Sequence, residues 1–125
     1  MSREIRVLLV DDERLVLSAL RRLLARAGFD VKTAMSGPEA VALLEKEPVD
    51  LIVSDYQMPG MTGIEFLREV APRWPDILRC MLTAQADKEL LDAALRDGLL
   101  HRAFRKPWDN RRLVADLQEL TRAVS

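Results

Sequence analysis

The chain has 125 residues, 49% hydrophobic and 31% charged, a balance that predicts a folded domain rather than a disordered chain. Its 19 basic and 20 acidic residues leave a net charge of −1, which argues against binding nucleic acid or an anionic membrane through the surface as a whole. One cysteine, Cys80, and one histidine, His101, exclude an internal disulfide and a thiolate or imidazole metal site. No signal peptide or membrane-spanning stretch is found, so we expect a cytoplasmic protein with one domain over residues 1–125.

Short apolar runs alternate along the chain with segments of helical periodicity. Strands are expected at residues 7–10, 29–34, 51–53, 77–82 and 101–105. Helices are expected between and after them, at 16–27, 36–47, 62–70, 87–95 and 109–120. The last four start at the capping residues Ser36, Thr62, Asp87 and Asp109, and glutamates at 39 and 65 complete two possible capping boxes. Five strands and five helices in strict alternation predict a parallel sheet covered on both faces.

Polar side chains follow four of the predicted strands at the point where each strand ends. Asp11 and Asp12 follow the first strand, Asp55 the third, Thr83 the fourth and Lys106 the fifth. Functional groups of parallel α/β sheets gather at this edge, and if the first and third strands are neighbours the three carboxylates converge. Converging carboxylates repel one another unless a cation neutralises them, and oxygen ligands suit Mg²⁺. Three acids, a hydroxyl and a lysine therefore indicate a phosphoryl-transfer site.

With these motifs in order, the sequence resembles the receiver domains of bacterial two-component response regulators from residue 7 to residue 120. The resemblance is carried by Asp11-Asp12, the segment Asp-x-x-Met-Pro-Gly-Met-x-Gly at 55–63, Thr83-Ala84 and Lys106-Pro107. It implies a flavodoxin-like (βα)5 fold, a doubly wound parallel α/β sheet with strand order 2-1-3-4-5. The ending Lys106-Pro107-Trp108-Asp109 also resembles receivers of hybrid sensor kinases and of regulators joined to cyclic-dinucleotide phosphodiesterases.

The resemblance also implies a signalling role and the residues that perform it. Asp55 would accept a phosphoryl group from a phosphohistidine on a sensor histidine kinase or a histidine phosphotransfer protein. Lys106, placed by a cis bond to Pro107, would pair with the phosphoryl oxygens, and the Thr83 hydroxyl would bond one of them. The domain would catalyse only its own phosphorylation and dephosphorylation, so it is not expected to be an enzyme on other substrates. Its output would pass to an attached domain or a target protein.

The implied cofactor is Mg²⁺. Asp12, Asp55 and the backbone carbonyl of Gln57 would ligate the ion directly, and Asp11 would hold it mainly through water. Gln57 and Gln85 lie two residues beyond Asp55 and Thr83, where they would tune the lifetime of the phosphoryl group.

One position departs from the family pattern. Receivers usually carry an aromatic switch residue three positions before the lysine, where this chain has Ala103, and an aromatic, Phe104, follows one residue later. Strand alternation predicts that the two side chains point to opposite faces, which would remove the ring from its usual place.

Other functions are weighed against this one. A flavin-binding relative would need a phosphate loop after the first strand, where the acids 11–13 would repel an unmetallated phosphate. An aspartate-nucleophile phosphatase would need acids one residue apart and a substrate cap, and a docking module would act without phosphorylation. The arginines at 102, 105, 111 and 112 are best explained as a solvated face, with a partner-docking surface as the alternative.

Overall fold

The structure, a computed structural model, describes residues 3–84 and 87–124. Strands and helices alternate strictly, and their bounds are β1 (Arg6–Val10), α1 (Arg14–Arg26), β2 (Asp30–Ala34), α2 (Gly37–Lys46), β3 (Leu51–Ser54), α3 (Gly63–Arg73), β4 (Leu78–Thr83), α4 (Lys88–Arg96), β5 (Arg102–Arg105) and α5 (Asn110–Leu120). The strands form one parallel sheet in the order β2-β1-β3-β4-β5. The predicted fold is confirmed, with element ends that differ by a few residues.

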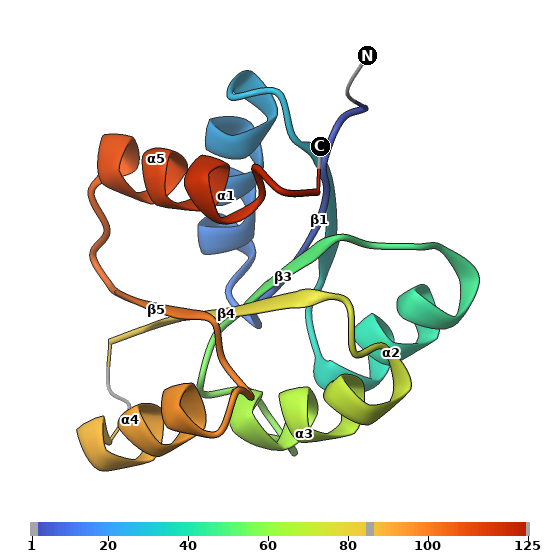
Figure 1. Cartoon of the computed structure of the whole chain (residues 1–125), viewed down its shortest axis with the longest axis vertical. Coiled ribbons are helices and arrows are strands. Elements are labelled where there is room, and N and C mark those ends of the chain that lie inside the picture. The colour runs from blue at the N-terminus through green and yellow to red at the C-terminus, as the bar shows by residue number, and fades with distance from the viewer. Residues whose placement is uncertain (1–2, 85–86, 125) are drawn as a thin grey trace.

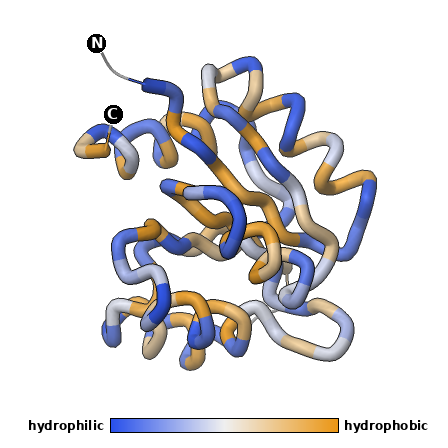
Figure 2. The backbone as a smooth tube through the Cα atoms, turned by 90° about the vertical axis from the view of Figure 1, so that its right-hand side faces the viewer, coloured by the Kyte–Doolittle hydropathy of each residue, from blue (hydrophilic) through white to orange (hydrophobic). Residues whose placement is uncertain are grey.

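The helices form two layers around this sheet. Helices α1 and α5 cover one face, and α2, α3 and α4 cover the other (Figure 1). Because strand side chains alternate between faces, Leu8 and Val10 of β1 join the core beside α2 and α3, while Val7 and Leu9 join the core beside α1 and α5. Apart from Arg6 in β1 and Arg79 in β4, the interior strands are mainly hydrophobic (Figure 2), as expected of a sheet buried on both faces.

The helix starts follow the predicted caps. The side chains of Ser36, Thr62, Asp87 and Asp109 each accept a hydrogen bond from the backbone of the following first turn. Thr62 and Glu65 form a complete capping box. The second expected box is wrong in one detail, because the Glu39 carboxylate accepts from the backbone N–H of Met35 at 3.0 Å rather than from that of Ser36.

A buried arginine joins two loops at the amino-terminal edge of the sheet. The Arg79 guanidinium donates to the carbonyls of Ile77 (2.9 Å), Gly98 (3.1 Å) and Leu99 (2.8 Å), and its backbone N–H donates to Nδ1 of His101 at 2.9 Å. These bonds tie the end of α4 to the start of β4. Within the residues described, no helix combines the length and apolar character needed to cross a bilayer.

Candidate functional site

Strand register brings the first two acidic motifs together. Val10 of β1 lies opposite Ser54 of β3, so the next residues on the two strands, Asp11 and Asp55, emerge side by side. The backbone N–H of Asp55 donates to the Val10 carbonyl at 2.8 Å, which extends the ladder to the site itself. The parallel pairing of β1 with β3 is therefore what converts a separation of 44 residues into a shared pocket.

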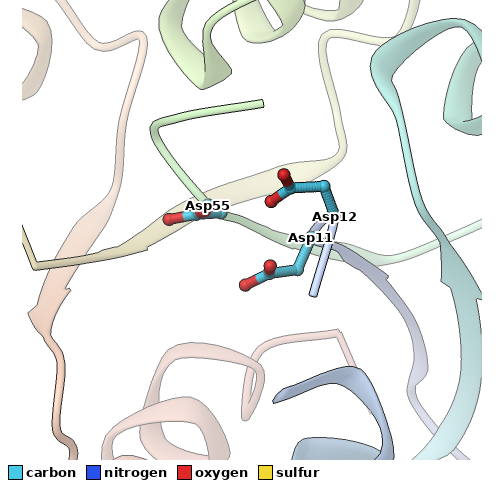
Figure 3. A group of neighbouring side chains, drawn as sticks. All are labelled: Asp11, Asp12 and Asp55. Carbon is cyan, nitrogen blue, oxygen red and sulfur yellow. The ribbon is translucent and has the colours of Figure 1, made fainter. Parts of the chain in front are cut away.

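Three carboxylates meet at this edge. Carboxylate oxygens of Asp11, Asp12 and Asp55 lie within 4.8 Å of one another, and the side chains extend to the same side from two strand ends (Figure 3). Asp11 and Asp55 are buried. Oxygen ligands at this spacing suit a hard divalent cation such as Mg²⁺, which also relieves the repulsion among the acids.

Lys106 comes from the end of β5 and places its ammonium group between two of these acids. Its Nζ lies 2.9 Å from Oδ2 of Asp11 and 3.4 Å from Oδ1 of Asp55. Its backbone N–H donates to the Thr83 carbonyl at 3.1 Å, so β4 and β5 together fix where the lysine leaves the sheet. The predicted convergence of strand ends is confirmed for all three acids and the lysine.

Burial and neighbouring charges set the ionisation of the pair. Burial raises the pKa of the Asp55 carboxyl, the Asp11 carboxylate adds to the rise, and Lys106 opposes it. Burial alone would lower the pKa of the Lys106 ammonium, but its hydrogen bond to Asp11 and the charges of Asp11 and Asp55 outweigh burial and raise that pKa. The lysine is therefore held as a cation at the point where negative charge accumulates.

The two oxygens of Asp55 are not equivalent. Oδ1 faces Lys106 and accepts the backbone N–H of Tyr56 at 2.9 Å. Oδ2 has no hydrogen-bond partner within residues 3–84 and 87–124. Tyr56 and Lys106 thus hold one oxygen, whereas the other has no such partner among the described residues.

Gly63 is a supporting residue whose role the sequence interpretation did not identify. A Cβ on Gly63 would collide with the backbone carbonyl of Asp55, and the Gly63 N–H donates to the Tyr56 carbonyl at 2.6 Å. The loop after β3 therefore folds back so that the start of α3 lies against the backbone of Asp55. The signal in the sequence was the second glycine of the segment at 55–63.

A pocket of about 490 Å³ opens beside these groups. It is lined by Asp12, Glu13, Asp55, Gln57, Met58, Pro59, Thr83, Ala84 and Lys106. Thr83 is buried at the end of β4, whereas Gln57 and Ala84 are exposed at the rim. The expected cis bond between Lys106 and Pro107 is present. Gln85, expected to tune the phosphoryl lifetime, lies outside the described residues.

The side chains of Ala103 and Phe104 lie on opposite faces of the sheet, as strand alternation predicted. Ala103 pairs with Met81 and Phe104 pairs with Leu82, in regular register and without a bulge. Phe104 packs against the core on the α1 and α5 side, whereas Met81 belongs to the core on the other side. The ring of Phe104 therefore lies on the face opposite to Ala103.

Fold and site together define a class: a parallel α/β domain with a lysine-containing acidic pocket at the carboxyl ends of its central strands. The sequence pattern of the response regulator receiver domain matches residues 7–118. The chain belongs to this family, and as a receiver domain it takes part in phosphorelay signalling.

Several relatives document the match. The hydrogenase transcriptional regulatory protein HoxA of Cupriavidus necator is 40% identical over 117 residues, which are 94% of this chain and 24% of HoxA. The DNA-binding transcriptional regulator NtrC of Salmonella typhimurium is 33% identical over 95% of this chain and 24% of its own length. The chain thus spans about a quarter of these two relatives.

Solved structures agree with the sequence comparison. The signal receiver domain of an HD domain-containing protein from Pseudomonas fluorescens superposes with a TM-score of 0.87 at 31% identity, covering 94% of each chain. The chemotaxis protein CheY4 of Vibrio cholerae superposes with a TM-score of 0.85 at 32% identity, covering 94% of this chain and 98% of CheY4.

Receiver domains share general properties that apply to this chain. Receiver domains bind Mg²⁺ at an acidic pocket, and the cluster of Asp11, Asp12 and Asp55 could hold such an ion. They interact with histidine kinases or phosphotransfer proteins and with output domains. The chain is a signalling domain, and the comparisons give no support to a phosphatase or to a docking module independent of phosphorylation.

Proposed function

We propose that Asp55 is the phosphoacceptor of this receiver domain and that Lys106 and Thr83 stabilise the phosphoryl group on it. The observation that carries the proposal is the placement of the Lys106 ammonium 3.4 Å from Asp55, in a pocket shared with Asp11 and Asp12. A buried carboxylate with one oxygen held by donors and the other without a partner within the described residues is suited to act as a nucleophile.

In the proposed step, Oδ2 of Asp55 attacks the phosphorus of a phosphohistidine on the partner. The new P–O bond forms as the P–N bond breaks, and the imidazole leaves with the electron pair. The product is an acyl phosphate, whose phosphoryl group carries about two negative charges in place of the single charge of the carboxylate. Lys106 then turns from Asp11 toward the phosphoryl oxygens, and the Thr83 hydroxyl, at the end of β4, donates to one of them.

The residues around Asp55 fit the expected Mg²⁺ ion. Asp12, Asp55 and the backbone carbonyl of Gln57 are proposed as ligands, with Asp11 acting mainly through water. All are hard oxygen donors, and the three carboxylates already lie within 4.8 Å of one another. When bound, the ion offsets negative charge on the transferring phosphoryl group.

We further propose that residues 1–125 form one receiver domain that works in the cytoplasm. Its donor would be a sensor histidine kinase or a histidine phosphotransfer protein, and the phosphorylated domain would pass the signal to an output domain or a target protein. Because HoxA and NtrC are transcriptional regulators about four times as long as the matched region, control of transcription by an output domain is one form this could take.

The test is phosphorylation by acetyl phosphate with Mg²⁺, followed by intact mass spectrometry. The parent chain should gain one phosphoryl group that is lost in acid or base, and Asp55→Asn should gain none. Asp76→Asn, an exposed acid in the loop before β4, is the control and should behave as the parent. Labelling of Asp55→Asn to the parent level at another residue would refute the proposal.

A further inference from the structure

A groove runs between α1 and α5, on the face of the sheet away from α2, α3 and α4 (Figure 1). It has a volume of about 370 Å³ and is lined by Leu23, Arg26, Ala27, Asn110, Arg111, Val114, Ala115 and Gln118. Leu23, Ala27 and Val114 are half-buried, so the floor is aliphatic while its borders reach solvent. None of the lining residues is acidic.

On one side of this groove lies α1, in which every charged residue is basic. Its charged residues are Arg14, Arg21, Arg22 and Arg26, and α1 contains no aspartate or glutamate. Arg111 and Arg112 add two positive charges at the start of α5. Within the part of the chain that the structure describes, none of these six arginines forms an ion pair. Arg26 and Arg111, the two of these arginines that line the groove, therefore have no ion-pair partner among the described residues.

Three of these arginines, Arg14 in α1 and Arg111 and Arg112 in α5, occupy positions that a helix does not favour. The first turn of a helix carries a partial positive charge, so basic residues there cost stability and acidic residues gain it. Helices α2, α3 and α4 obey this rule with Glu39, Glu65 and Glu89. The first turn of α5 instead holds Arg111 and Arg112 and no acid. Asp109 caps α5, but no acid lies in its first turn, so helix stability does not account for Arg111, the one of these arginines that lines the groove.

We propose that the groove between α1 and α5 docks an acidic amphipathic helix of a partner protein. Leucine-like side chains of the partner would occupy the aliphatic floor, in the manner of other helices bound in grooves. Carboxylates flanking them would meet Arg26 on one border and Arg111 on the other. The charges would contribute mainly association rate and orientation, and the floor would contribute the apolar burial.

The same observations disfavour a polyanion such as nucleic acid. An aliphatic floor offers nothing to a phosphate backbone, which is bound through hydrogen bonds and charge. The net charge of the chain is −1, and Asp11, Asp12 and Asp55 form a strongly acidic region at the start of α1.

The probe is a fluorescein-labelled peptide of about 18 residues, long enough to form a helix. It carries leucine at helical spacing and glutamate at the remaining positions, and a matched peptide carries lysine for glutamate. Fluorescence anisotropy should show binding of the glutamate peptide alone. Its affinity should fall at least tenfold for Arg26→Glu/Arg111→Glu and for Val114→Asp. Glutamate at position 111 is favoured in the first turn of α5, whereas glutamate at position 26 is disfavoured in the last turn of α1, so the two helix effects oppose each other and the charge variant should fold.

Arg96→Glu is the control for charge. Arg96 is exposed in the last turn of α4, as Arg26 is in the last turn of α1, but lies across the sheet from the groove. It should leave peptide affinity unchanged. Equal binding of both peptides, no binding of either, or an equal loss with Arg96→Glu would overturn the proposal. So would tighter binding of single-stranded DNA or phosphatidylserine vesicles that the groove variants abolish.

Docking of the peptide at the groove should not depend on phosphorylation of Asp55. Arg26→Glu/Arg111→Glu should accept the phosphoryl group from acetyl phosphate at the parent rate, because neither side chain lines the acidic pocket. Loss of peptide binding with phosphorylation intact supports the groove alone. Intact peptide binding in the Asp55→Asn chain would show that the groove binds the peptide without phosphorylation of Asp55.

Discussion

Single side chains in the acidic pocket owe their state to the groups that surround them. Asp55 is buried and lies beside the Asp11 carboxylate, and both effects raise its pKa; Lys106 opposes them. Lys106 in turn is closer to Asp11 than to Asp55, by 2.9 against 3.4 Å. The lysine therefore serves chiefly as the counter-ion of Asp11 in this structure, and under the proposed function it would turn to the new negative charge on Asp55.

Asp12→Ala should separate metal binding from stability. Removing one of three converging carboxylates relieves repulsion, so the melting temperature without metal should rise or stay level. The stabilisation that Mg²⁺ gives the parent should largely disappear, because a ligand that binds the folded state is weakened. Melting curves with and without Mg²⁺ decide this, with Asp76→Ala as control. A full Mg²⁺ shift in Asp12→Ala would show that Asp12 is not a ligand.

Gly63→Ala should disturb Asp55 without touching its side chain. The added methyl group meets the Asp55 backbone carbonyl, so either α3 or the end of β3 must move. We expect a loss of roughly 1–3 kcal/mol in unfolding free energy together with slower phosphorylation by acetyl phosphate. Denaturant unfolding and mass spectrometry measure the two effects. Glu69→Ala, an exposed change on the same helix, should stay within about 0.5 kcal/mol of the parent.

At the scale of elements, β5 departs from the expected family pattern at Ala103. In receivers with an aromatic at the position of Ala103, the ring fills the space that the Thr83 side chain vacates on activation. Here Ala103 faces the α4 side of the sheet with a small side chain, and Phe104 is committed to the core beside α1 and α5. Since no bulge turns Phe104 around, the ring cannot take part in that movement.

We therefore expect a small rearrangement of the surface formed by α4, β5 and α5. The measurement is amide chemical-shift mapping on addition of Mg²⁺ and a beryllofluoride phosphoryl mimic. Shifts should concentrate near Asp12, Asp55, Thr83 and Lys106. Large shifts through residues 90–95 and 111–117 would contradict the expectation. Ala103→Tyr, which restores a ring on that face, is the matched variant and should enlarge the shifts in α4.

The elements also show what sequence can and cannot predict. Apolar runs and caps such as Thr62 located every strand and helix, because periodicity and capping are local properties. Convergence of the acids followed from parallel strand order, which the family resemblance supplied. The contact of Gly63 with Asp55 could not be predicted, since it depends on how a loop folds back. Arg79 was equally hidden, because a charged residue within a strand indicates exposure until its partners are known.

At the scale of the whole molecule, the two edges of the sheet differ in kind. The carboxyl edge holds the acidic pocket, and the amino edge holds Arg79, whose buried guanidinium is satisfied by backbone carbonyls. His101 lies beside it and accepts the Arg79 N–H through Nδ1. Burial and the charges of Arg79 and Arg102 lower the pKa of the His101 imidazole, so the folded state keeps this side chain neutral.

Stability should consequently depend on pH through His101. The unfolded chain takes up a proton near pH 6.5, the ordinary value, whereas the folded chain resists protonation. The contribution of His101 is therefore complete above that pH and is lost as pH falls through 6.5 toward the lowered folded pKa. Urea unfolding between pH 7.5 and 5.5 should show this decline. His101→Asn, which keeps an acceptor but does not titrate, should have a flatter profile, and an identical slope would contradict the assignment.

The amino edge also gathers the two described ends of the chain. Arg3 is paired with Asp50 at 2.6 Å, and Arg3 and Val124 line the same hollow. The start of β1 and the chain that follows α5 lie close together (Figure 1). The length of β1, about 17 Å for five residues, separates this place from the acidic pocket. A fluorophore, an affinity tag or a sensor chip attached at either end should therefore leave Asp55 accessible, and the proposed phosphotransfer should be measurable on an immobilised chain.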